Sequence, residues 1–526
     1  MPFIQGFVKK LIVPGKPVAL FGMGCLAVLC LLALDDDLKV QHDSGIYITL
    51  GKSLASGLGY REIYRAGHPP HTTYPPVFPT LLAPVIFAFG YHVLAMKLLL
   101  TAIAVAALYL LYIFMRDLSD DRMASVVVVF TATSHGLLFY AQSIMAEMPY
   151  LFFSLLALCW LHRWVKSGEW SNRREAMAMA VTLIALPYLT RLIGLSLLLA
   201  VVAYLVCETS GRLAVRIKRA MLLGGLAAIP ALLWFGRNWW LSKHTATAYV
   251  SGYFPRVVYG SRSTAEGLLS HIDMVYTNLY KYAVHTGRVI FFNAPWVSET
   301  FLPLLLAAVV LAGFLWCAVR RRTIVEYYVF FYMGGVLPFH GLRPQRYLVP
   351  LIPFICYYFF IAVLQGFSWI QRKSILRAPV YQQGAMAVAT FLLVCLLTAN
   401  GAAAVWGNLI CSGREGYYHV MGEEGYVNVV PWVTAHTPPE SIFAWAKPSL
   451  RFIRTERKGI NYPQTRQMDD LLRFLYAQYV DYVVTDSFSK RTQWYLGALV
   501  EHYPEHFRLV YEDEVSKVYK VAVVER

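Results

Sequence analysis

Residues 93–115 read VLAMKLLLTAIAVAALYLLYIFM, an apolar run with a single charged residue, Lys97. A helix needs about 20 such residues to cross the hydrocarbon core of a bilayer. Comparable runs occupy residues 18–34, 221–234, 301–319 and 385–405. Of the 526 residues, 57% are hydrophobic and 15% are charged, whereas soluble chains carry about 25% charged residues. The sequence therefore predicts an α-helical polytopic membrane protein.

The formal net charge of +16 does not indicate a nucleic-acid partner, because the basic residues are not gathered on one face or in one tail. They cluster in alternate connections between the apolar runs, at 9–16, 116–122, 163–174, 212–219, 320–322 and 372–377. This alternation is the positive-inside pattern, and it predicts a cytoplasmic N-terminus. We expect about eleven crossings from hydropathy, which places the C-terminus outside.

The eight cysteines are single and lie mostly within apolar runs, so we expect small core residues rather than disulfides or zinc ligands. We also expect no cleavable signal peptide, because the first apolar run lacks a small-residue cleavage site.

Three regions between or after the spans face outward on this topology: 35–76, 241–299 and 412–526. In the first, residues 44–58 are predicted to form an amphipathic helix in the membrane interface, with Asp43 at its start. The last alternates predicted strands (441–446, 480–485, 507–511, 518–524) with predicted helices (467–479, 491–503). We expect a membrane domain over 1–411, which carries the two outer loops, and a small extracytoplasmic α/β domain over 412–526.

Charged residues at the edges of spans are costly and are functional candidates for that reason. Guanidinium groups bind phosphate oxygens in bidentate fashion, and a carboxylate can act as a general base. This mixture fits the displacement of a phosphate from a sugar by a hydroxyl or amine at the membrane surface. The outward charges that provide it are Asp43, Glu147, Arg191, Arg237, Arg343 and Arg346.

Each of these residues also has a purely structural interpretation. Asp43 can cap a helix. The arginines can pair with Glu147 or extend toward lipid head groups. Residues 74–76, Tyr-Pro-Pro, can form a rigid turn. The presence of several such charges on one face favours the functional interpretation.

A metal site is weakly indicated. The run Asp35, Asp36 and Asp37 either ends a helix in solvent or binds a divalent cation. His42, His68 and His71 are irregularly spaced on a loop, which is a poor pattern for ligands. We expect that no cofactor is required, and the sequence leaves open whether the protein binds a divalent cation.

The order of these motifs resembles that of bacterial GT-C fold glycosyltransferases, relatives of protein O-mannosyltransferases, aminoarabinose transferases and lipopolysaccharide galacturonosyltransferases. Their first outer loop is matched by His42-Asp43-Ser44, Tyr47, residues 54–60, Tyr74-Pro75-Pro76 and Pro79. Later landmarks are matched by Glu147-Met148-Pro149, Thr190-Arg191, residues 234–238, Arg346-Tyr347-Leu348, Pro350 and Pro353. The likeness covers most of the membrane part, and the tail resembles a small outer domain that many members carry.

The resemblance implies that Asp43 is the catalytic base of an inverting transfer from a polyprenyl-phosphate sugar, in the bacterial cytoplasmic membrane. Asp43 is followed by Ser44, where aminoarabinose and protein mannosyl enzymes have an acidic pair. The acceptor therefore stays open between lipid, glycan and protein. We expect three residues to bind the donor phosphate, Arg191, Arg237 and Arg346, and the further site candidates are His42, Tyr74, Glu147, Arg343 and Tyr347.

Two other functions share part of this evidence. A transporter or flippase of lipid-linked sugars also needs outward arginines and a membrane cavity, although the chain shows no internal repeat of the inverted-repeat kind. A non-catalytic assembly protein would instead recruit partners through the tail.

Overall fold

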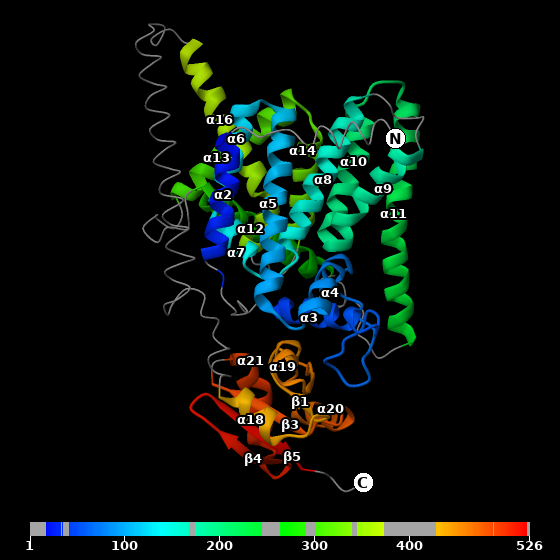
Figure 1. Ribbon diagram of the computed structural model, residues 1–526, viewed down its shortest axis with the longest axis vertical. Helices are drawn as coiled ribbons and strands as arrows, with labels where there is room; N and C mark the ends of the chain where they lie inside the picture. Colours follow the sequence, from blue (N-terminus) through cyan, green and yellow to red (C-terminus); the bar gives the residue numbers. More distant parts are fainter. Residues whose placement is uncertain are drawn as a thin grey trace.

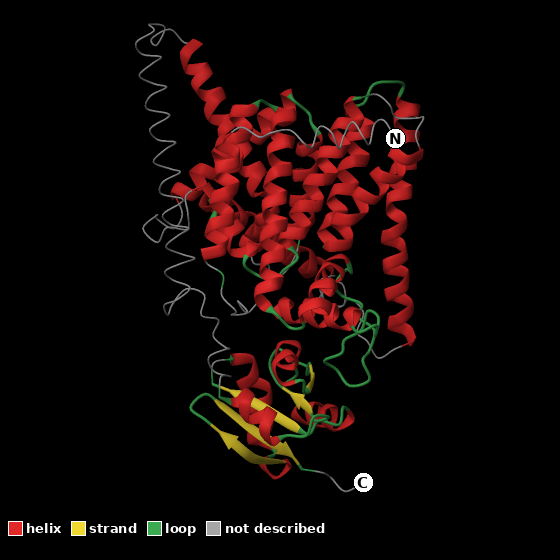
Figure 2. Cartoon of the chain, in the orientation of Figure 1, coloured by secondary structure: helices red, strands yellow, loops and turns green. Residues whose placement is uncertain are grey.

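The computed structural model describes residues 17–32, 34, 42–167, 174–244, 264–290, 301–338, 344–372, 428–487 and 489–522. The described chain is a helical bundle with a small C-terminal sheet beyond one end (Figures 1 and 2). The predicted fold class is thus confirmed. The predicted span 385–405, the boundary at 411/412, the Asp35–Asp37 run and Arg343 lie outside the described residues.

The bundle consists largely of apolar helices. Their bounds are α2 Pro17–Leu32, α5 Val93–Leu118, α6 Asp121–Ala132, α7 His135–Ala141, α8 Glu147–Lys166, α9 Arg174–Thr190, α10 Leu195–Glu208, α11 Leu213–His244, α12 Thr264–Ile290, α13 Phe301–Arg320, α14 Ile324–Val336, α15 Pro344–Leu348 and α16 Ile352–Arg372. Polar caps set several of their starts. At α14, Thr323 and Glu326 form a capping box, in which Thr323 N–H donates to Glu326 Oε2 over 2.6 Å.

The predicted count of about eleven crossings is not confirmed. In the described ranges, five helices are long and apolar enough to cross a membrane, or six when α6 and α7, bent by 62°, count as one span. Four further apolar helices are shorter, including α2 and α14. The predicted outer region 241–299 contains all of α12.

Helix α3 His42–Ala55 of the first outer loop and helix α4 Val77–Phe89, which directly follows the loop, pack against each other at the end of the bundle nearest the tail (Figure 1). The prediction of a helix over 44–58 is confirmed, with an end three residues earlier than predicted. Its setting differs from the prediction, however, because residues 44–51 are all buried. A helix in the membrane interface would leave one face exposed. Both α4 and the tail cover α3, which accounts for the difference.

The tail is an α/β domain, as predicted. Its sheet has the order β2-β1-β3-β5-β4, in which β1 is parallel to β2 and β3, and β5 is antiparallel to β3 and β4. The strands are β1 Ile442–Ala444, β2 Lys458–Ile460, β3 Tyr482–Asp486, β4 Phe507–Glu512 and β5 Ser516–Val521. Helices α18 Val429–His436, α19 Pro448–Thr455 and α20 Met468–Ala477 accompany them. The predicted helix 491–503 is divided into α21 Lys490–Thr492, a π-helical turn Gln493–Gly497 and α22 Ala498–His502.

The tail docks on the first outer loop through α19. Lys52 Nζ of α3 and Glu456 Oε1 form an ion pair of 2.8 Å, and Gly459 N–H donates to the Tyr64 carbonyl over 2.8 Å. At the centre of this contact α3 carries Gly45 rather than a larger residue. A Cβ at this position would lie 2.7 Å from Leu450 Cγ and 2.9 Å from Leu450 N. Glycine therefore permits the close approach of α19 to α3.

Gly45→Ala is expected to loosen this docking, because the new methyl group overlaps both the side chain and the backbone of Leu450. Overpacking of this kind costs about 1–3 kcal/mol. Limited proteolysis of the purified protein in detergent should release the tail faster than in the wild type. Gly24→Ala on α2, where an added Cβ meets nothing within 4 Å, is the matched control. An unchanged cleavage rate for Gly45→Ala would contradict the docking role.

Candidate active site

A buried carboxylate at the start of α8 gathers two arginines. Glu147 is fully buried, and its Oε1 accepts hydrogen bonds from Arg191 Nη1 at 2.8 Å and from Arg346 Nε. Arg346 belongs to α15. Arg191 follows the last residue of α9, where the backbone becomes extended. A single acidic group therefore joins three separate parts of the bundle.

The break after α9 brings Arg191 to this position. The chain turns back sharply through the 3₁₀ helix Leu192–Gly194, and Gly194 N–H donates to the Arg191 carbonyl at 2.8 Å. A Cβ on residue 194 would lie 2.4 Å from Tyr188 N. Only glycine fits so close to the preceding helix, and the tight turn places the Arg191 guanidinium 5.0 Å from the centre of the Tyr347 ring.

Arg346 also reaches the predicted base. Its Nη1 donates to Asp43 Oδ2 over 2.5 Å, and Tyr74 Oη donates to Asp43 Oδ1 over 2.7 Å. Asp43 stands in the first turn of α3 and is largely buried, with 14% of its side chain exposed. Arg191 and Arg346 thus pair with Glu147, as the structural interpretation predicts, and Arg346 also contacts Asp43; their contact with a donor phosphate stays a prediction.

These side chains line one cavity of about 460 Å³. Its polar part includes Asp43, Tyr74, Arg191 and Arg346, and Tyr347 borders it. The remaining wall is largely apolar, formed by residues that include Leu195, Leu199, Phe235, Phe331 and Val336. A cavity with charged groups beside an apolar wall suits a ligand that is itself part anionic and part hydrocarbon.

Arg237 lies apart from this cluster. Its Nη1 donates to the His71 carbonyl at 2.9 Å and to Asn238 Oδ1 at 2.7 Å, and it does not line the cavity. The guanidinium lies 5.2 Å from the centre of the Trp234 ring. These contacts tie the end of α11 to the first outer loop.

Of the other predicted site residues, some lie near the cavity and one lies outside the described part of the chain. His42 begins α3 beside Asp43, and Arg343 lies outside the described residues. Across the described ranges no three His, Cys, Asp or Glu side chains gather as a metal site would require. The sequence did not single out Tyr47, which lines the cavity, or Asn238, whose Nδ2 donates to the Thr72 carbonyl at 2.9 Å. Both residues belong to the series of motifs that resembles the GT-C enzymes, but nothing in the sequence indicates a role for either.

Glu147→Gln is expected to destabilise the protein by about 3–5 kcal/mol, because removal of one partner leaves buried charges uncompensated. The measurement is reversible denaturation in mixed micelles. Asp470→Asn, which breaks an exposed ion pair with Arg473 in the tail, serves as control and should leave the midpoint unchanged. Equal midpoints for Glu147→Gln and the wild type would show that the two arginines do not depend on this carboxylate.

No protein-family model matches this sequence, and no curated protein matches it. Solved structures do match. The chain is similar to ArnT from Cupriavidus metallidurans bound to undecaprenyl phosphate, with a TM-score of 0.57 and 14% identity over 95% of this chain and 97% of that one. It is also similar to the oligosaccharyltransferase AglB from Archaeoglobus fulgidus in complex with an inhibitory peptide and a dolichol-phosphate, with a TM-score of 0.55 and 14% identity over 94% and 73%. The chain therefore has the GT-C fold of these membrane glycosyltransferases.

Proposed function

We propose that this protein is an inverting glycosyltransferase that moves a sugar from a polyprenyl-phosphate donor to an acceptor at the outer face of the bacterial cytoplasmic membrane. The observation that carries the proposal is the meeting of Asp43, Arg191 and Arg346 in one cavity with an apolar wall. The two structural neighbours support a lipid-phosphate donor, since one is bound to undecaprenyl phosphate and the other to a dolichol-phosphate.

The reaction would be a single displacement. The acceptor hydroxyl or amine attacks the anomeric carbon of the donor, and Asp43 takes its proton. The bond between the anomeric carbon and the phosphate oxygen breaks, and polyprenyl phosphate leaves with the electron pair. The acceptor attacks the anomeric carbon from the side opposite the phosphate, so a single displacement inverts the configuration at this carbon. The ion pair with Arg346 favours the ionised carboxylate that this role requires.

Arg191 and Arg346 are the proposed donor-phosphate ligands. A guanidinium has five N–H donors, and the contacts to Glu147 and Asp43 use only Arg191 Nη1 and the Nε and Nη1 of Arg346. The other N–H groups are available to phosphate oxygens, where they would stabilise the charge of the leaving group. Arg237 holds the loop beside the site, and a direct phosphate contact for it stays a prediction from the sequence.

A flippase of lipid-linked sugars is the rival function. The paired Asp43 and Tyr74 favour the transferase, because a carrier needs no base beside the phosphate. The two functions differ in their products. A transferase converts the donor into free polyprenyl phosphate and a glycosylated acceptor, whereas a flippase returns the donor unchanged on the other side of the vesicle.

Asp43→Asn is expected to lower transfer by at least about 100-fold, in the range that loss of a general base produces. The assay follows release of polyprenyl phosphate from a panel of polyprenyl-phosphate sugars, with mass spectrometry of the glycosylated product. Asp470→Asn, remote on α20, is the control and should transfer at the wild-type rate. Wild-type transfer by a stably folded Asp43→Asn variant would overturn the role of the base.

Arg191→Lys and Arg346→Lys are each expected to raise KM for the donor about tenfold, because an ammonium group cannot bind two phosphate oxygens in a plane. Arg237→Lys should change the donor KM less, since Arg237 contacts backbone and amide groups outside the cavity. Initial rates over a range of donor concentrations give the comparison. A larger increase in the donor KM for Arg237→Lys than for Arg191→Lys would indicate that Arg237, and not Arg191, contacts the phosphate.

A further inference from the structure

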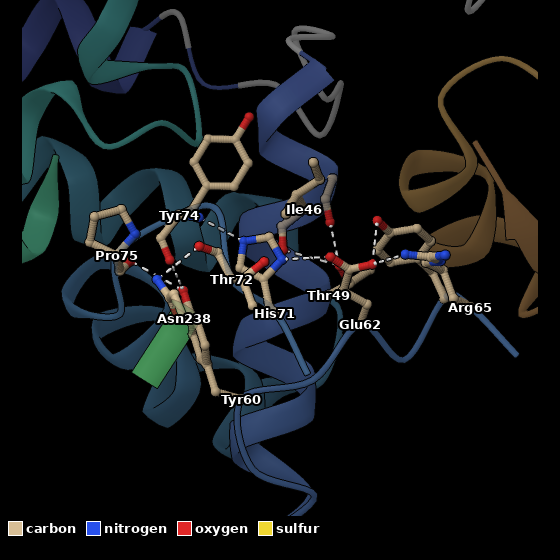
Figure 3. Close-up of polar contacts among 12 residues, drawn as sticks. Ile46, Thr49, Tyr60, Glu62, Arg65, His71, Thr72, Tyr74, Pro75 and Asn238 are labelled. Carbon is tan, nitrogen blue, oxygen red and sulfur yellow. Dashed lines mark hydrogen bonds and ion pairs between the residues drawn. The ribbon is translucent and has the colours of Figure 1, made fainter. Parts of the chain in front are cut away.

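Behind the cavity lies a buried histidine whose two ring nitrogens are both engaged. Tyr74 N–H donates to His71 Nε2 over 2.8 Å, so Nε2 is the acceptor and carries no proton. The proton therefore sits on Nδ1, which donates to Glu62 Oε1 over 2.8 Å. Figure 3 shows this line of contacts from Glu62 through His71 to the backbone of Tyr74. Only 2% of His71 is exposed.

Glu62 is held as a carboxylate by its neighbours. Burial by itself raises the pKa of Glu62, but the hydrogen bond from His71 and the charge and hydrogen bond of Arg65 lower the pKa below its usual value. Arg65 Nη1 donates to Glu62 Oε2 over 3.0 Å, and Tyr64 Oη donates to the same oxygen over 3.3 Å. The acceptor that His71 needs is thus present at neutral pH.

The same segment is fixed from its other side. Tyr60 Oη donates to the Tyr74 carbonyl over 2.8 Å, and the His71 and Thr72 carbonyls accept from Arg237 and Asn238 of α11. The His71 and Tyr74 rings are parallel, with centroids 5.6 Å apart. Backbone and ring of Tyr74 are therefore both constrained, and its hydroxyl is presented to Asp43 at 2.7 Å.

We propose that Glu62 and His71 are positioning residues, which orient Tyr74 and through it the carboxylate of Asp43. This inference rests on the proposed function, in which Asp43 is the base. Neither Glu62 nor His71 lines the cavity, so neither contacts the donor. His71 is not itself a base or a metal ligand, because both of its nitrogens are occupied within the protein.

A pair of substitutions separates the contacts of His71. His71→Asn retains an N–H donor at the position of Nδ1 but loses the acceptor for Tyr74 N–H. His71→Gln places an amide oxygen near the position of Nε2 and restores that acceptor. We expect His71→Asn to lower kcat between about tenfold and 100-fold, the effect of misplacing a reacting group by about 1 Å. The donor KM should not change, and His71→Gln, which restores the acceptor for Tyr74 N–H but not the donor to Glu62, should recover part of kcat.

Tyr74→Phe provides the second arm, because it removes the hydroxyl that contacts Asp43 and leaves the contacts of His71 in place. If His71 acts through Tyr74, the double variant His71→Asn/Tyr74→Phe has the kcat of Tyr74→Phe alone. Losses of kcat that multiply in the double variant would overturn the proposal. A raised donor KM with unchanged kcat in His71→Asn would also overturn it.

Asp43→Asn, measured in parallel, distinguishes a failure of the positioning role of His71 from a failure of the proposed function. If Asp43→Asn abolishes transfer while His71→Asn keeps wild-type kcat, the positioning role is wrong and the proposed function stands. If Asp43→Asn retains transfer, both fail together. Should His71→Asn not yield folded protein, Glu62→Gln gives the same comparison with Tyr74→Phe, because it weakens the acceptor for His71 Nδ1 and leaves the ring in place.

Discussion

The arrangement of the site depends on the buried carboxylate of Glu147. A charged group with no exposure to solvent is tolerated only when partners surround it, and here Arg191 and Arg346 supply them. Because these arginines come from the break after α9 and from α15, the requirement fixes how three parts of the bundle meet. Arg346 then extends the same network to Asp43 on the first outer loop. Two carboxylates and two guanidinium groups thereby balance in charge beside the cavity.

Part of this site could be predicted from the sequence because charged residues in apolar surroundings are conspicuous. Asp43, Glu147, Arg191 and Arg346 were selected on that ground, and the structure brings all four together. The helices over 93–115 and 301–319 followed from hydropathy alone. The number of crossings is not confirmed, because helices such as α14 are shorter than a membrane span requires and the predicted span 385–405 lies outside the described residues. Arg237 was selected in the same way, yet it lies with the loop backbone, since hydropathy does not say where a side chain points.

Sequence patterns could not predict the burial of α3 or the role of the first loop, because both depend on how the chain folds back on itself. The residue that crowds Gly45 is Leu450, and the partner of Lys52 is Glu456, so the contacts that bury α3 come from the far end of the chain. Glu62 and His71 meet because the loop turns through Gly57, Gly59 and Gly67, each with positive φ. In the sequence His71 is only a weak candidate for metal ligation, because its spacing from the other histidines is irregular; the folded loop uses both of its nitrogens for hydrogen bonds.

The tail and the base are connected through this loop. Gly459 N–H binds the carbonyl of Tyr64, and the hydroxyl of the same tyrosine contacts Glu62, which holds His71 and so Tyr74. A second path runs directly from α19 to α3, the helix that carries Asp43. The residues of the first path up to His71, namely Gly459, Tyr64, Glu62 and His71, are all buried, so a shift of the tail displaces the loop as well. Recruitment of partners is therefore not needed to account for the tail, because its docking already constrains the carboxylate on which the proposed chemistry depends.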